Sequence, residues 1–277
     1  MTLSSRNTVF KIGIVFSLAI LVFLLIASYT ALPFYPELLR TATGRSSGFL
    51  AAANIRFLAP VPLVPYITTI GAVFYSLITM VFIFYYFEKT QSPEILFVAF
   101  FALSFSFEAA RIMPPLRIAL ELPGVSLSLA QRFLLFGRYF GIFSIFTASV
   151  CAAGLELQSQ RSAILIITLS ALVIAVGIPV DGFSWDSSFS MISGYGTMFA
   201  LVEAVLTLIT AISFVVSAQT RSSREYLFIG GGTFIALLGR GLFLRADTWL
   251  TPFPGLVCLV LGTLFICGKL RQVYLWL

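Results

Sequence analysis

The chain has 277 residues, of which 59% are hydrophobic and only 10% are charged. A soluble domain of this length carries about 25% charged residues, because polar side chains must cover its core. Apolar runs of roughly 20 residues, the length that spans a bilayer as a helix, follow one another almost end to end. The composition excludes a water-soluble domain and predicts an all-α, polytopic transmembrane helix bundle, with residues 1–277 forming one integral membrane domain.

The sequence contains no histidine, which excludes any mechanism that needs imidazole on this chain as a base, a metal ligand or a haem ligand. Cys151, Cys258 and Cys267 lie in apolar runs without CxxC spacing, so neither a disulfide framework nor a metal site is indicated. The net charge of +6 is scattered, with no cluster of four or more Lys or Arg, and we expect no nucleic-acid partner. We expect no cofactor, no metal and no catalytic residues.

Eight apolar runs predict eight spans, at 9–32, 61–87, 94–113, 128–155, 162–180, 194–217, 226–244 and 254–275. The first has a longer apolar core than the ~7–15 residues of a signal peptide, so we expect a retained anchor. Pro114 and Pro115 are expected to end the third helix. We expect a loop at 181–193 and a short interfacial helix within 49–57.

The orientation follows from Lys and Arg in the short loops, which are more frequent on the cytoplasmic side. With the N-terminus inside, that side holds Arg6, Lys11, Lys89, Arg161, Arg221, Arg224, Lys269 and Arg271. The opposite side holds Arg40, Arg45, Arg56, Arg117 and Arg245. The excess predicts that both termini face the cytoplasm, in an inner or plasma membrane.

Five ionisable residues fall well inside predicted spans: Glu108, Arg111, Arg138, Glu203 and Arg240. A charge at the bilayer centre costs roughly 2.5–3.5 kcal/mol, so each needs a partner or a water-filled cavity. Glu108 and Arg111 are three positions apart, which predicts an ion pair on one helix face. A rise of about 1.5 Å per residue brings all five to the middle-to-outer part of the bundle.

Two interpretations of these charges remain open. Three arginines against two glutamates leave one surplus positive charge, which favours an outward-facing pocket for an anion such as a carboxylate or a lipid phosphate. Alternatively, the charges are interhelical salt bridges that hold the bundle in register, with Arg111 snorkelling to the interface.

The glycines favour close helix packing, since small residues let backbones approach where lipid gives no hydrophobic drive. The segment "GRYFG", residues 137–141, has GxxxG spacing, and "GGG" at 230–232 is followed by Gly239 and Gly241. We expect these faces to pack within the bundle.

The layout resembles the multi-span sensory input modules that bacteria place ahead of cytoplasmic signalling domains. The features are "FYYFEKTQSPEILFVAFFALSFSFEAAR" at 84–111, with its aromatic span end, charged turn and late polar pair, and the final "KLRQVYLWL". The resemblance implies a sensory or regulatory role. No output domain follows, so we expect such a regulator to act through another membrane or cytoplasmic protein.

Other functions stay open beside this one. A charged midplane and the helix-breaking "GIPVDG" at 177–182 are compatible with a transporter, or with a protein that handles a lipid or a small anion. An accessory subunit of a membrane complex fits equally well. The segment "FEAAR" is similar to the glutamate–arginine motif of glutamate-type intramembrane proteases, but the paired glutamate and the histidines of that chemistry are missing, so we expect no enzyme.

Overall fold

The computed structural model describes residues 3–31, 33, 63–90, 92–154, 160–185, 191–193, 196–220, 223–244 and 250–275. The interfacial helix expected within 49–57 lies outside these residues, as does the loop arginine Arg245.

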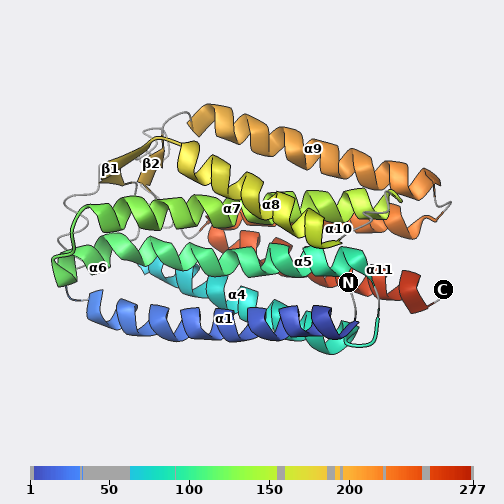
Figure 1. The fold of residues 1–277 in the computed structure, drawn as a ribbon, viewed down its shortest axis with the longest axis horizontal. Coiled ribbons are helices and arrows are strands. Elements are labelled where there is room, and N and C mark those ends of the chain that lie inside the picture. Colours follow the sequence, from blue (N-terminus) through green and yellow to red (C-terminus); the bar gives the residue numbers. More distant parts are fainter. Residues whose placement is uncertain are drawn as a thin grey trace.

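The described chain is a bundle of long helices that run side by side (Figure 1). In order they are α1 (Leu3–Ala31), α4 (Leu63–Phe87), α5 (Pro93–Ser104), the 3₁₀ segment η2 (Phe105–Ile112), α6 (Met113–Leu120), α7 (Val125–Ala152), α8 (Gln160–Gly177), α9 (Gly196–Thr220), α10 (Glu225–Leu244) and α11 (Pro252–Leu275). With α5, η2 and α6 taken as one span, eight helices in the described ranges are long and apolar enough to cross a membrane. The eight apolar helices expected from the sequence are therefore present in the described ranges, and they fit a multi-pass membrane protein. Both chain ends lie at the same end of the bundle.

The prediction that Pro114 and Pro115 end the third helix is wrong. Both prolines lie in the first turn of α6, which continues the span to Leu120. A first turn tolerates proline because its backbone N–H groups have no partner within the helix. The span ends instead at Glu121, whose φ of 50° is left-handed and whose backbone N–H donates to the carbonyl oxygen of Arg117.

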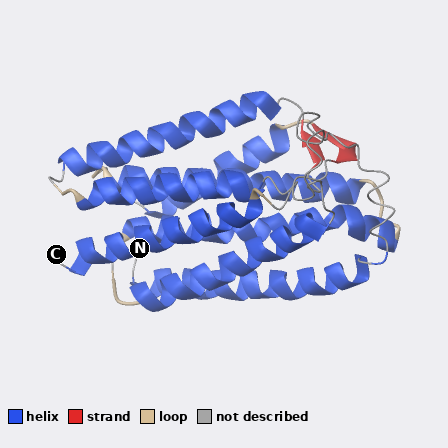
Figure 2. Ribbon diagram, turned by 180° about the vertical axis from the view of Figure 1, so that it is seen from behind, coloured by secondary structure: helices blue, strands red, loops and turns tan. Residues whose placement is uncertain are grey.

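The expected loop at 181–193 is also a correction, because the structure forms a hairpin there. Strand β1 (Val180–Trp185) pairs antiparallel with β2 (Met191–Ser193), so that Val180 lies opposite Ser193. The register is irregular between the two ends. The hairpin lies at one end of the bundle, away from the termini (Figure 2). Aspartate, glycine and serine dominate the segment and favour turns, which hides two such short strands from a sequence pattern.

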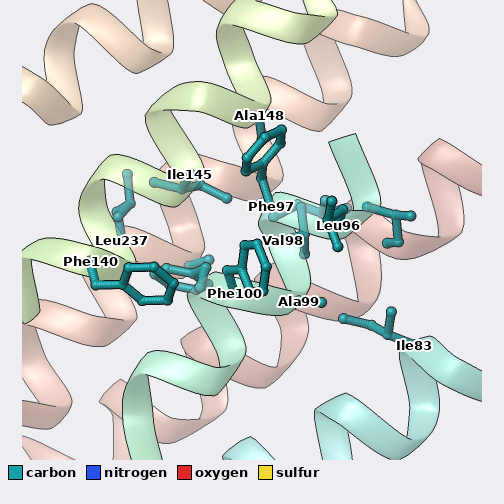
Figure 3. Packing of buried hydrophobic residues seen from close by; sticks show 14 of the residues in the cluster. Ile83, Leu96, Phe97, Val98, Ala99, Phe100, Phe140, Ile145, Ala148 and Leu237 are labelled. Carbon is teal, nitrogen blue, oxygen red and sulfur yellow. The ribbon is translucent and has the colours of Figure 1, made fainter. Parts of the chain in front are cut away.

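The hydrophobic core lies around α5, which is enclosed on all sides and has no lipid-facing stripe. Leu96 and Phe100 of α5 pack with Phe140 and Ile145 of α7, and Ile83 of α4 closes the cluster (Figure 3). Helices α1, α8 and α9 lie at the periphery, with only a small share of their residues buried. The central position of α5 fixes the place of η2, which continues it.

Glycines set the closest helix contacts, as the sequence predicts. A Cβ at Gly137 would collide with the side chain of Phe107, and one at Gly141 with Ser104. The two glycines of "GRYFG" therefore let α7 pack closely against the third span within the bundle. Helices α10 and α11 meet backbone to backbone, where a Cβ at Gly239 would lie 2.8 Å from the carbonyl oxygen of Gly255.

Candidate functional site

The site is built on η2, where the third span changes from α to 3₁₀ geometry for eight residues. Runs of 3₁₀ helix longer than three or four residues are uncommon, because their hydrogen-bond geometry is poorer. Side chains at i and i+3 eclipse one another in this geometry. Glu108 and Arg111 therefore stand directly above one another, and Nε of Arg111 lies 2.8 Å from Oε2 of Glu108. The predicted ion pair is present.

Glu108 also pairs with a second arginine, from α7. Arg138 approaches it side-on, with Nε 3.0 Å from Oε1 and Nη2 3.3 Å from Oε2. The carboxylate is only 4% exposed. Two guanidinium groups on one buried carboxylate leave a local surplus of one positive charge.

Arg240 of α10 connects Glu203, the second glutamate, to the network. Its Nη1 forms an ion pair with Oε1 of Glu203 on α9, and its Nη2 donates a 3.0 Å hydrogen bond to the carbonyl oxygen of Arg138. The five residues predicted from depth alone therefore meet in one network. It joins η2, α7, α9 and α10.

Arg111 does not snorkel to the interface. Its side chain is 2% exposed, and Nη2 donates a 2.8 Å hydrogen bond to the carbonyl oxygen of Leu244, the last residue of α10. The final carbonyl groups of a helix have no partner within it and carry partial negative charge, so a buried guanidinium satisfies them well.

The network is closed on one side and open on the other. Arg111, Glu108 and Arg240 are nearly fully buried, whereas the side chain of Arg138 is 25% exposed and that of Glu203 is 46% exposed. Nη1 of Arg138 has no hydrogen-bond partner in the ranges that the structure describes. On the open side, between α7 and α9, Arg138 thus has a donor that no described residue accepts, within a network of three positive and two negative charges.

A triangle of serine hydroxyls supports the start of η2, and the sequence analysis missed it. Ser106 lies 2.9 Å from both Ser17 of α1 and Ser76 of α4, which are 3.2 Å apart. All three are fully buried. They stand at similar distances along their helices from the same end of the bundle, so the depth argument used for the charges could have found them.

An open apolar groove of about 340 Å³ borders η2 on the side of α1 and α7. Phe16, Phe107 and Phe133 line it together with Ala110 and Met113. The third span is therefore held by charges on one face and borders an open groove on another.

The chemistry of the site is that of charge recognition. Within the described part of the chain, no group of three or more His, Cys, Asp or Glu residues could hold a metal ion. The described cysteines are free thiols that are buried or half-buried. The side chains of the network can bind an anion through arginine, exchange ion-pair partners, or fix the helices in register.

No family model matches the chain, and no curated protein matches it.

Proposed function

We propose that the chain is a sensory or regulatory module of an inner or plasma membrane, with both termini in the cytoplasm, that acts through a partner protein and carries no catalytic machinery. The observation that carries this proposal is the buried ion-pair network on a 3₁₀ segment in the middle of a span. A structural salt bridge does not need such a segment, whereas a switch needs an element with two arrangements.

The segment η2 has the properties of such an element. A 3₁₀ helix rises about 2.0 Å per residue and an α-helix about 1.5 Å, so conversion of eight residues shortens the span by about 4 Å and ends the eclipsed alignment of Glu108 with Arg111. The groove beside η2 gives room for this change. The ion pair with α7 and the hydrogen bond from Arg111 to the last carbonyl group of α10 pass the movement to other helices.

The ligand that such a module would sense is a small anion or an anionic lipid headgroup. Arginine binds carboxylate and phosphate groups through a planar fork of N–H donors. Arg138 presents its free Nη1 on the open side of the network. An anion bound there competes with Glu108 for the same guanidinium and so weakens the contact that holds η2 to α7.

The first experiment is purification from the native membrane in gentle detergent, with mass spectrometry of the proteins and lipids that co-elute. A stoichiometric signalling protein supports the regulatory role. A partner that is a large membrane complex without a signalling component would instead favour an accessory subunit. A solitary chain would count against action through a partner.

The second experiment tests the input with a matched pair of variants on α7. Arg138→Gln removes the proposed donor, and Arg132→Gln removes an exposed charge from the same helix. A ligand that binds the folded state raises the unfolding temperature in a concentration-dependent way. We expect acetate, inorganic phosphate or phosphatidylglycerol vesicles to do so for the wild type and Arg132→Gln, but not for Arg138→Gln. Equal increases of the unfolding temperature in all three proteins would show that the anion does not bind at Arg138.

Transport of an anion is the second candidate, favoured by the half-exposed Glu203 beside the buried Arg240. Reconstituted vesicles distinguish the two functions. Flux of the bound anion that is lost in Glu203→Gln and Arg240→Gln would establish transport. Anion binding without flux would leave the regulatory role.

A further inference from the structure

A second open apolar groove lies between α4 and α11, apart from η2 and its charges. It has a volume of about 410 Å³ and is lined by residues 71–82 of α4 and 256–264 of α11. Phe74 and Ile78 on one wall and Leu264 on the other are exposed. The groove therefore opens on the outer surface of the bundle, which faces lipid in a membrane.

The floor of this groove needs no polar ligand. Tyr75 and Thr263 meet there, with their hydroxyl oxygens 2.6 Å apart. Thr263 donates its own proton to the carbonyl oxygen of Leu259, so Tyr75 is the donor to Thr263. This hydrogen bond also holds α4 and α11 together at the middle of the groove. A helix, which is about 10–12 Å across, cannot enter between the two walls, whereas a single hydrocarbon chain can.

The length of the groove matches one leaflet of a bilayer. Residues 71–82 extend over about 16 Å, at a rise of about 1.5 Å per residue. The hydrocarbon core of a bilayer is about 30 Å thick, so one leaflet contributes about 15 Å. Phe87, the last residue of α4, accepts a hydrogen bond from Arg6 near the N-terminus. The groove therefore lies in the leaflet on the side of the two termini.

A cation lies at the end of the groove that faces the termini. The guanidinium of Arg271 on α11 lies 4.6 Å from the ring centroid of Tyr86 on α4. Tyr86 is one turn beyond Phe82, and Arg271 is two turns beyond Leu264, so both continue the helix faces that line the groove. Helical side chains lean towards the N-terminus of their helix, which brings this guanidinium back towards the groove. Arg271 is exposed, and no described carboxylate pairs with it.

We propose that the groove between α4 and α11 binds one phospholipid from the leaflet on the side of the termini. An acyl chain fills the groove, and the phosphate accepts hydrogen bonds from Arg271, which the ring of Tyr86 holds through a cation–π contact. Every phospholipid carries this phosphate, so the site does not need an anionic lipid. It is separate from the anion proposed at Arg138, and it does not depend on a regulatory role of the chain.

Native mass spectrometry of the full chain, released from detergent micelles that contain phosphatidylcholine, tests the headgroup contact. We expect the wild type to retain one lipid molecule per chain. Arg271→Gln removes the phosphate donor and should weaken lipid binding about tenfold, the factor that a charge-assisted hydrogen bond supplies. Arg161→Gln removes an exposed cation from the first turn of α8 and should bind the lipid as the wild type does.

A matched pair of variants on α11 tests the groove itself. Val260→Trp fills the groove with an indole ring, and Leu261→Trp places the same ring at an exposed position outside it. We expect the first variant to lose the lipid and the second to keep it. In the wild type, binding should strengthen as the acyl chain is lengthened, because each buried CH₂ group contributes. If Val260→Trp does not fold, Ile78→Trp fills the groove from α4.

Three results would overturn the proposal. The first is equal lipid binding within either pair, Val260→Trp with Leu261→Trp or Arg271→Gln with Arg161→Gln. The second is a dimer of the chain that Val260→Trp dissociates, because the groove would then bind a second copy. The third is a protein that purifies with the wild type but not with Val260→Trp, which would show that the groove binds a protein partner instead of a lipid.

Discussion

Nη2 of Arg240 donates a 3.0 Å hydrogen bond to the backbone carbonyl oxygen of Arg138, so that one buried arginine holds the main chain of another. Nη1 of the same guanidinium pairs with Glu203. Arg240 thereby ties α10 to the backbone of α7 and to the half-exposed side of α9. A displacement of α9 changes the position of Arg240, and through it the helix that carries the second arginine bound to Glu108.

Glu108→Gln should be the most damaging single change in the network. It leaves Arg111 and Arg138 without their carboxylate, and removing one partner of a buried ion pair costs about 3–5 kcal/mol. The measurement is the free energy of unfolding in mixed micelles of mild detergent and dodecyl sulfate. The exposed Glu88→Gln is the matched control and should be close to neutral.

The double variant Glu108→Gln with Arg138→Gln separates the ion pair from the loss of a side chain. It removes one positive charge along with the negative one, so the double variant should be more stable than Glu108→Gln alone. Additive destabilisation by the two changes would show that Arg138 does not interact with Glu108 in the folded protein.

Ser106→Ala should cost about 0.6–1.7 kcal/mol, the range measured for hydrogen bonds between membrane-embedded side chains. The change removes both 2.9 Å contacts of the hydroxyl triangle but leaves Ser17 and Ser76 in contact with each other. Thermal unfolding of the purified protein measures it, with the exposed Ser4→Ala as the control. A cost indistinguishable from that of Ser4→Ala would mean that the triangle does not hold η2.

Hydropathy and depth predicted most of the fold and the membership of the charge network. Charged side chains in apolar spans need partners, because an isolated charge in the membrane is costly. Counting residues along each span was therefore enough to place Glu108, Arg138 and Arg240 at a similar depth. The counting could not show that Glu108 serves two arginines, because that depends on how α7 is rotated against η2. Helix rotation is set by contacts such as Gly137 with Phe107, which a single sequence does not specify.

Two features of the third span were beyond prediction for different reasons. The 3₁₀ segment is less apolar than the α-helix before it, because it carries Glu108 and Arg111, but polarity alone does not distinguish 3₁₀ from α geometry. Glu94 is the first residue of the span predicted at 94–113. Its partner Tyr274 lies 180 residues away, and no local pattern connects them.

Arg6→Gln should destabilise the protein by about 1.5–3 kcal/mol, because hydrogen bonds from a charged group are the stronger ones and glutamine reaches fewer of the acceptors. Arg6 is 5% exposed and donates to carbonyl oxygens at the end of α4 and in the turn before α5, including those of Phe87 and Thr90. Lys11→Gln removes an exposed cation from the same helix and should have little effect. Unfolding in dodecyl sulfate compares the two, and equal stabilities would mean that Arg6 does not secure the turn.

Gly239→Ala and Gly241→Ala should change stability in opposite directions, although they lie two residues apart on α10. The added Cβ at Gly239 meets the backbone of α11, which cannot move aside as a flexible side chain can, so we expect a loss of about 1–3 kcal/mol. A Cβ at Gly241 meets nothing within 4 Å, and replacing a helical glycine by alanine gains up to about 1 kcal/mol. Thermal unfolding of both variants beside the wild type measures the difference. Destabilisation by both substitutions would show that the glycines are needed for the conformation of α10 itself. The predicted opposite signs would show that the cost at Gly239 comes from its contact with α11.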